Sequence, residues 1–171
     1  CKPDRAIKGD ITMWQQIHEA LVAEFSDVTD LAGLVRIVVR LLVAALLGGL
    51  LGLERQQQRK SAGVRTHMLV CIGAALFVLI PEQAGASIGD MSRVLQGLVA
   101  GIGFLGAGAI IQGAAQTETK GLTTAAGIWV TAAVGIAAGM GRELTAVIST
   151  LAALFILSVI PRLYALGAKK T

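Results

Sequence analysis

The sequence predicts an all-α, polytopic membrane protein with about five transmembrane helices, preceded by an amphipathic interfacial helix. Of the 171 residues, 54% are hydrophobic and 15% are charged, whereas soluble domains carry about 25% charged residues. Residues 121–140 and 144–160 hold no charge over 20 and 17 positions, which is about the length that spans a bilayer. The chain also combines 21 glycines with 4% aromatic residues, which favours closely packed helices over a β-barrel with aromatic girdles.

An amphipathic segment over residues 11–28 comes first. Apolar side chains recur there every three or four positions, and glutamine and glutamate side chains occupy the opposite side. Asp10 is placed to cap this helix, and we assign residues 13–33 to the N-terminal helical region. Trp14 near one end favours a helix lying in the membrane interface; packing of the helix on the bundle is the alternative. Residues 1–12 are interpreted as a processed end or a cloning remnant.

Five hydrophobic spans follow. They cover residues 34–53, 64–80, 94–111, 121–140 and 144–160. Asp30 caps the first span, Pro81 ends the second and Pro161 ends the fifth, because proline lacks the amide hydrogen that a helix interior needs. The connections are short, so consecutive spans should pack as antiparallel neighbours. Residues 34–161 therefore form one transmembrane domain, and residues 162–171 form a short basic tail.

Lysine and arginine are unevenly distributed between the two sides of the predicted bundle. One side carries eight basic residues: Arg55, Arg59, Lys60, Arg65, Lys120, Arg162, Lys169 and Lys170. The other side carries four: Arg36, Arg40, Arg93 and Arg142. Short cytoplasmic loops of membrane proteins carry the excess of lysine and arginine. We therefore expect the N-terminus outside and the C-terminus in the cytoplasm.

Seven glycines are candidates for helix packing. They lie in the first and third spans, at small-x-x-x-small spacing or along one bare side of a helix: Gly48, Gly52, Gly97, Gly101, Gly103, Gly106 and Gly108. Missing side chains let two helix backbones approach and gain van der Waals contact that lipid cannot supply. Because most of these glycines belong to the third span, we expect that span to be the most buried helix or a dimer contact.

Four polar residues form a predicted cluster at the outer face: Arg40, Asp90, Arg93 and Gln96. Arg40 lies about 6 Å deeper than Arg36 by helix rise. An intramembrane arginine costs roughly 3 kcal/mol at the bilayer centre, so it should have a partner or face water. We expect Glu82 or Asp90 to pair with Arg40; snorkelling of the side chain to the interface is the alternative.

Seven polar residues are predicted at the inner ends of the spans: Glu54, Arg55, Arg65, Thr66, His67, Thr123 and Thr124. Glu54 ends the first span, where the helix dipole disfavours a carboxylate, so a cation should lie near it. One interpretation is a Glu54–Arg65 ion pair that staples the helical hairpin. The other is a polar pocket lined by Glu54, His67 and the two threonines.

The sequence carries no signature of an enzyme or a metal protein. It holds no Cys/His metal spacing, no nucleophile elbow and no phosphate loop with lysine. Residues 101–106 spell G-x-G-x-x-G, but they lie inside a hydrophobic span rather than after a strand. Cys71 also lies in a span and is interpreted as a small core residue. We therefore expect no enzyme activity, no cofactor, no bound metal and no nucleic-acid partner.

Three segments resemble the MgtC/SapB family of bacterial membrane proteins. Residues 41–79, LLVAALLGGLLGLERQQQRKSAGVRTHMLVCIGAALFVL, are similar to the family's first helical hairpin. Its third and fourth helices resemble GLVAGIGFLGAGAII at 97–111 and GLTTAAGIWVTAAVGIAAGMG at 121–141. Arg93 and Gln96 match the polar residues that lead into the third helix. The resemblance covers nearly all of the hydrophobic part, and it corresponds to the family's transmembrane region without the soluble C-terminal domain of some members.

The resemblance implies a bacterial inner-membrane protein linked to growth at low magnesium, acid stress and the survival of intracellular pathogens. It also implies ATP synthase as a membrane-protein partner. One hypothesis is a regulatory protein that acts through helix–helix contacts with such partners and with itself, as a homodimer or higher oligomer. The alternative is a transporter or channel for a small ion, Mg²⁺ or H⁺, along the inner polar residues.

Overall fold

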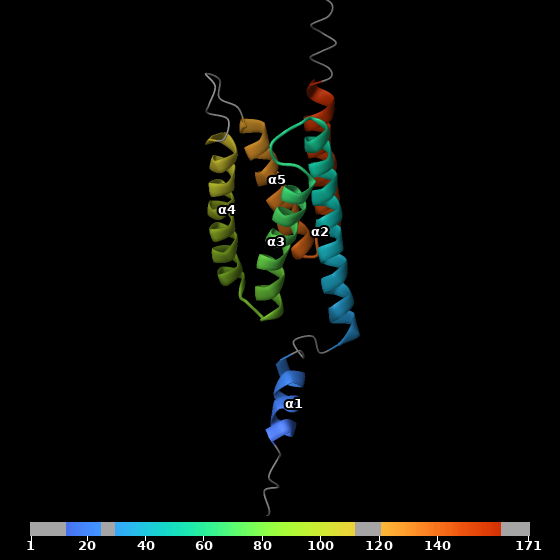
Figure 1. The fold of residues 1–171 in the computed structure, drawn as a ribbon, viewed down its shortest axis with the longest axis vertical. Coiled ribbons are helices and arrows are strands. Elements are labelled where there is room, and N and C mark those ends of the chain that lie inside the picture. Colours follow the sequence, from blue (N-terminus) through green and yellow to red (C-terminus); the bar gives the residue numbers. More distant parts are fainter. Residues whose placement is uncertain (1–12, 25–29, 112–120, 162–171) are drawn as a thin grey trace, which may run out of the picture. The chain divides into compact units, whose positions relative to one another are not determined.

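The computed structural model describes residues 13–24, 30–111 and 121–161, whose regular structure is entirely helical. The elements in chain order are α1 (Met13–Glu24), α2 (Leu31–Gln57), α3 (Val64–Gln83), α4 (Ile88–Ile111), α5 (Leu122–Gly139), α6 (Glu143–Leu154) and the π-helical η1 (Phe155–Val159) (Figure 1). In this described part, α2, α3, α4 and α5 are long and apolar enough to cross a membrane. The fifth predicted span is a shorter apolar helix, Glu143–Val159. The predicted all-α class is confirmed.

The chain divides into two compact units, Cys1–Arg36 and Ile37–Thr171. In the first unit, the predicted cap of α2 is present, because Asp30 Oδ1 accepts a hydrogen bond from the amide of Gly33 at 3.0 Å. The apolar side of α1 is exposed at Trp14 and Leu21. The predicted cap Asp10 lies outside the described residues, and both interpretations of the N-terminal helix stay open.

In the second unit, α2 and α3 form a closely packed antiparallel hairpin. A Cβ added at Gly48 would lie 2.7 Å from Cβ of Cys71, and one added at Gly52 would lie 2.5 Å from Cα of Val64. Real Cβ atoms essentially never approach other atoms so closely, so only glycine fits at these two positions. Both glycines are among the residues that the sequence selected for helix packing, and Cys71, which was interpreted as a small core residue, is buried.

Helix α5, which is not adjacent to α3 in the sequence, also packs closely against it. A Cβ added at Gly139 would lie 2.5 Å from the carbonyl oxygen of Ala75, and one added at Gly135 would collide with the carbonyl oxygen of Cys71. Gly135 meets Cys71, and Gly139, four residues later, meets Ala75, four residues later on α3. The two helices therefore run parallel. These two glycines are not among the predicted packing residues, although they are spaced four residues apart in an uncharged span.

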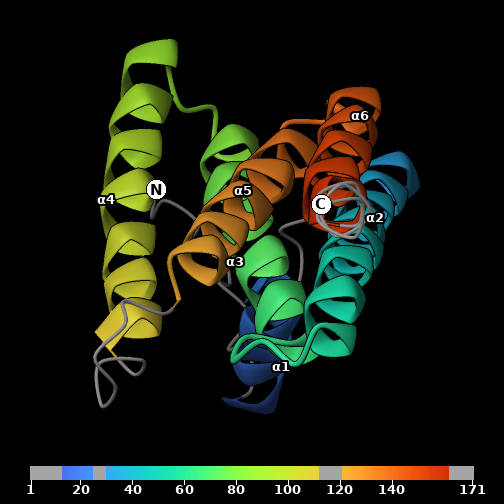
Figure 2. The same ribbon diagram turned by 90° about the horizontal axis from the view of Figure 1, so that it is seen from above.

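The prediction that the third span is the most buried helix is wrong. None of the residues in the apolar window of α4 is buried, and α4 lies at one edge, with α5 between it and α6 (Figure 2). A Cβ added at four of the glycines of α4 would meet no described atom within 4 Å: Gly97, Gly101, Gly103 and Gly108. The core position beside α3 is taken by α5, whose glycines allow the closer approach. Gly106 alone of the predicted set in α4 faces a neighbour, with an added Cβ 3.6 Å from that of Ala125.

Four helix ends differ from the predicted spans by three residues or more, and two of these belong to α2, which runs from Leu31 to Gln57 instead of from 34 to 53. Pro81 does not end α3, which continues to Gln83. A proline this close to the end interrupts few backbone hydrogen bonds. Helix α4 begins six residues earlier than predicted, because Ser87 caps it: Ser87 Oγ accepts from the amide of Asp90 at 3.2 Å and donates to its carboxylate at 2.6 Å. The Ser-x-x-Asp spacing is a capping signal that was readable in the sequence.

Candidate functional site

A cluster of buried polar side chains lies where α2 ends and α3 begins. The members predicted for the inner face divide into two groups. Four of them are buried: Glu54, Arg55, His67 and Thr124. The other three are exposed: Arg65, Thr66 and Thr123. The position of a Cβ added at Gly127 would be 3.6 Å from Nε2 of His67 and 4.0 Å from Cδ of Arg55, so α5 brings its bare backbone to the place where these two side chains meet.

Glu54 and Arg55 form a buried ion pair between neighbouring residues of one helix. The Arg55 guanidinium donates to Oε2 of Glu54. The hydroxyl of Ser158 donates to Oε1 of Glu54 at 3.1 Å, and Arg55 Nη2 donates to the carbonyl oxygen of Leu157 at 3.3 Å. The predicted Glu54–Arg65 staple is therefore wrong. Glu54 is buried against the C-terminal helix, whereas Arg65 is exposed.

The π-helical segment η1 supplies both partners of this ion pair. Leu157 and Ser158 lie inside Phe155–Val159, where α6 changes to π-helical hydrogen bonding. Short π-helical segments occur frequently at functional sites. Ser158 was not selected from the sequence. Its signal was weak: a single hydroxyl within an uncharged apolar run.

His67 is fully buried, at 0% exposure. Its Nδ1 lies 3.0 Å from the carbonyl oxygen of Gly63, one turn earlier. Among the described residues, no group forms a hydrogen bond with its Nε2. The side chain thus has one satisfied and one unsatisfied nitrogen in the interior of the bundle.

Arg40 forms a second ion pair near the opposite end of α2. Its Nη1 donates to Oε2 of Glu82 at 2.7 Å and to the carbonyl oxygen of Gly139 at 2.8 Å. These two groups lie at the C-terminal ends of α3 and α5, where the helix dipole favours a cation. Of the two partners expected for Arg40, the structure therefore selects Glu82. Gly141, at a φ of +68°, lets the turn after α5 pass close to the guanidinium, since an added Cβ would lie 2.5 Å from Nη2.

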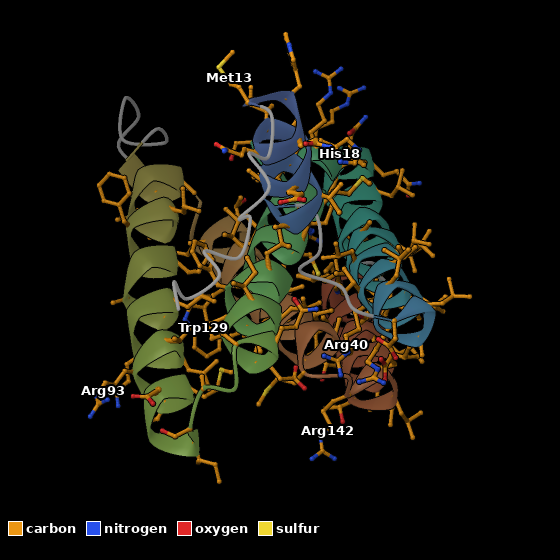
Figure 3. All side chains as sticks on the ribbon, turned by 90° about the horizontal axis from the view of Figure 1, so that it is seen from below. Met13, His18, Arg40, Arg93, Trp129 and Arg142 are labelled. Carbon is orange, nitrogen blue, oxygen red and sulfur yellow. The ribbon has the colours of Figure 1, made fainter. Side chains whose placement is uncertain are left out.

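The other residues of the predicted outer-face cluster do not join Arg40. Asp90 and Arg93 pair with each other at 2.6 Å, three residues apart on α4. Gln96 is exposed on the same helix, and the side chain of Arg93 is also largely exposed on α4 (Figure 3). The outer polar residues therefore form two separate pairs, one between helices and one on the surface of α4.

An apolar groove of about 640 Å³ runs between α3 and α4. Its α3 wall includes Leu69, Gly73 and Phe77, and its α4 wall includes Gly97 and Gly101. Both walls contain bare glycine backbone, because an added Cβ at any of the three glycines would meet no described atom within 4 Å. The groove is thus lined by apolar side chains and by bare glycine backbone.

The comparison with known proteins assigns the family. Residues 41–166, which contain the buried cluster and the groove, match the MgtC family. The chain belongs to the MgtC family. With four helices long and apolar enough to span a bilayer in its described part, this MgtC-family chain is a multi-pass membrane protein. In the same described part, no group of three or more His, Cys, Asp or Glu side chains is placed to hold a metal ion.

Several named proteins are similar to this MgtC-family chain. Protein SrpB of Synechococcus elongatus is 47% identical over 135 residues, which is 72% of this chain and 74% of SrpB. A protein named putative magnesium transporter YhiD, of Escherichia coli, is 38% identical over 74% of this chain and 61% of its own length. Protein MgtC of Salmonella typhimurium is 40% identical over 67% of this chain and 48% of its own length. No solved structure matches the chain.

Proposed function

We propose that this MgtC-family chain is a regulatory, non-enzymatic protein of the bacterial inner membrane that acts by binding membrane partners through α4. The observation that supports this most directly is the bare glycine backbone on the uncovered side of that helix. The stress conditions implied by the family resemblance are low magnesium, acid and life inside host cells. The name of one relative, the putative magnesium transporter YhiD, agrees with a link to magnesium.

The physical reason lies in how helices associate in lipid. Lipid tails are as apolar as leucine, so helices associate through close packing of small residues rather than through hydrophobic burial. At about 100° per residue, Gly97, Gly101 and Gly108 lie within about 40° of one another on α4. Phe104 lies on the same side and is 81% exposed. The exposed ring of Phe104 lies between glycines. Helix α4 therefore offers both a side chain that can insert into a partner helix and a gap that can receive a side chain from it.

A second copy of the chain is the first partner that we propose for this surface, as a homodimer or a higher oligomer. A matching face on each copy would satisfy the self-complementarity that a two-fold contact requires. Another membrane protein, such as the ATP synthase that the family resemblance implies, is the second partner.

Replacing Gly101 by Leu tests the proposed contact. A Cβ at Gly101 meets no described atom within 4 Å, so the fold should tolerate the change while a partner helix is pushed away. We expect self-association in membranes, measured by chemical cross-linking, to weaken roughly tenfold, equivalent to about 1.4 kcal/mol. Val99→Leu, on another exposed side of α4, is the control and should leave the oligomer unchanged. An unaltered oligomer in the Gly101 variant would exclude this surface.

Ion transport is the second candidate function, and one observation favours it: Glu54, Arg55 and His67 are charged or titratable groups buried inside the bundle. However, the carboxylate of Glu54 is already bound by Arg55 and Ser158, and Mg²⁺ sites use carboxylates together with retained waters. Purified protein in sealed liposomes discriminates between the functions. Flux of Mg²⁺ or H⁺ that is lost on Glu54→Gln would support transport. Absence of flux, with an intact growth phenotype of the same protein in cells, would favour regulation.

A further inference from the structure

Three exposed cations lie at the end of the bundle where α2 is followed by α3. Arg59 and Lys60 belong to the connection between the two helices, and Arg65 belongs to the first turn of α3. None of the three takes part in an ion pair between described residues. Lysine and arginine clustered beside a membrane span attract anionic lipid head groups. The described part of this end therefore has the charge that an anionic ligand requires.

A pocket of about 340 Å³ lies between this connection and the helices α4 and α5. Its polar lining consists of Ser61 and Thr66, whose hydroxyls can donate hydrogen bonds to an anion. Each of these residues is next to a cation in the chain, Ser61 to Lys60 and Thr66 to Arg65. The charges and the hydroxyls thus converge on one side of the pocket.

The opposite side of the pocket is apolar. Helices α4 and α5, both long and apolar enough to span a bilayer, contribute this part of the lining: Phe104, Leu105, Gly108, Ala109 and Ile128. The pocket therefore passes from polar residues at a helix end to apolar residues of two spans. A phospholipid has the same order of groups, since its charged phosphate is joined to an acyl chain. A soluble anion would match the polar side alone. The volume lies within the range of pockets that bind small molecules, about 300–1,000 Å³.

We propose that this pocket binds an anionic phospholipid. The phosphate oxygens accept hydrogen bonds from the hydroxyls of Ser61 and Thr66 and from the guanidinium of Arg65. Hydrogen bonds between charged groups are about twice as strong as those between neutral groups. The first part of an acyl chain lies along Phe104 and Leu105. A lipid with a cationic amine in its head group binds less well, because the neighbouring cations repel the amine. The site does not rest on the function proposed for α4.

Native mass spectrometry of the purified protein tests the site. The protein is mixed in detergent with equal amounts of phosphatidylglycerol, which is anionic, and phosphatidylcholine, which is neutral overall, with identical acyl chains. We expect the anionic lipid to be retained preferentially. Arg65→Gln should lower the ratio of retained anionic to neutral lipid about fivefold, the effect of one cation near an anionic head group. Thr66→Val removes a hydroxyl at almost constant size and should lower the ratio by a smaller factor. Arg142→Gln, at an exposed arginine between α5 and α6, is the matched control and should leave the ratio unchanged.

Three outcomes would overturn the proposal. The first is equal retention of the two lipids by the unsubstituted protein. The second is a ratio that stays the same in Arg65→Gln and Thr66→Val, or that falls as far in Arg142→Gln. The third is displacement of the anionic lipid by glycerol 3-phosphate at the same concentration, which would indicate a site for a soluble phosphate. Both substituted residues of the site are exposed, so the variants should fold; if Arg65→Gln does not, Thr66→Val decides.

Discussion

Two arginines of α2 are held in the bundle in the same manner, each by one carboxylate and one backbone carbonyl. Arg40 binds Glu82 and the carbonyl of Gly139; Arg55 binds Glu54 and the carbonyl of Leu157. By helix rise, the two residues lie about 22 Å apart along α2. At one end the charges therefore link α2 to α3 and α5, and at the other they link it to η1. Intramembrane charges are costly unless paired, which explains why both arginines use helix carbonyls as well as carboxylates.

At this scale, removing the cation of the buried pair should be more harmful than removing both charges. Arg55→Met leaves the carboxylate of Glu54 buried without a cation, and we expect a loss of roughly 3–5 kcal/mol in unfolding free energy. The double variant Arg55→Met, Glu54→Gln should recover most of that loss. Unfolding of the purified protein in detergent measures both. Arg93→Met, in the exposed pair on α4, should change stability by less than about 1 kcal/mol. A double variant no more stable than the single one would contradict this account of the pair.

At the element scale, the bundle is built around α3. Gly48 and Gly52 of α2 meet it from one side, and Gly135 and Gly139 of α5 meet it from another. Helix α3 presents small side chains to both neighbours, such as Cys71 and Ala75, which are buried. Backbones at van der Waals distance replace the large apolar side chains that fill the core of a soluble bundle. The remaining long helix, α4, has bare glycines of its own but lies at the edge.

The same substitution, glycine to alanine, should lower stability at a core glycine but not at a glycine of α4. Gly139→Ala places a Cβ 2.5 Å from the carbonyl oxygen of Ala75. Since backbone cannot move aside cheaply, we expect a loss of about 1–3 kcal/mol in stability. Gly97→Ala adds a Cβ that meets no described atom within 4 Å and should be neutral or slightly stabilising, because alanine favours a helix by up to about 1 kcal/mol over glycine. Thermal unfolding in detergent compares the two variants; equal melting temperatures would refute the distinction.

At the scale of the whole molecule, the distribution of basic residues predicts the sidedness of the membrane domain. The side that holds the α2–α3 connection, the α4–α5 connection and the C-terminal tail carries eight of the basic residues of the spans and loops, against four on the other side. We propose the basic side as cytoplasmic, because the excess of lysine and arginine in short loops determines orientation.

Two reporter fusions test this orientation. A reporter that is active only in the cytoplasm should be active when fused after Thr171. A reporter that is active only outside should be active when inserted after Gly85, in the connection between α3 and α4. Activity on the opposite side at both positions would invert the topology and leave the fold unaffected. If the reporter fused after Thr171 is found outside while the outside-specific reporter after Gly85 is active, then Glu143–Val159 does not cross the membrane.

Local features of the site could be anticipated from the sequence, whereas the partners within it could not. The cap at Asp30, the close packing of Gly48 and Gly52, and the burial of Cys71 follow from neighbours in the chain and from residue size. The choice of Glu82 for Arg40 was one of two expected alternatives. The cation that pairs with Glu54 was predicted wrongly, because it is the adjacent Arg55 rather than Arg65. The second partner of Glu54, Ser158, lies in a π-helical segment about a hundred residues further along the chain and was not predicted.

The sequence alone determined that this protein is a helical membrane protein and where its hydrophobic spans lie, because the length of an uncharged run is a local property that the thickness of the bilayer converts into a span. Only the tertiary structure decided which helices meet: that α5 packs against α3, and that α4 lies at the edge with its glycines uncovered. The reason is that a membrane removes the contrast on which inside–outside patterns depend. A helix face that meets lipid and one that meets another helix are both apolar, so composition cannot tell them apart.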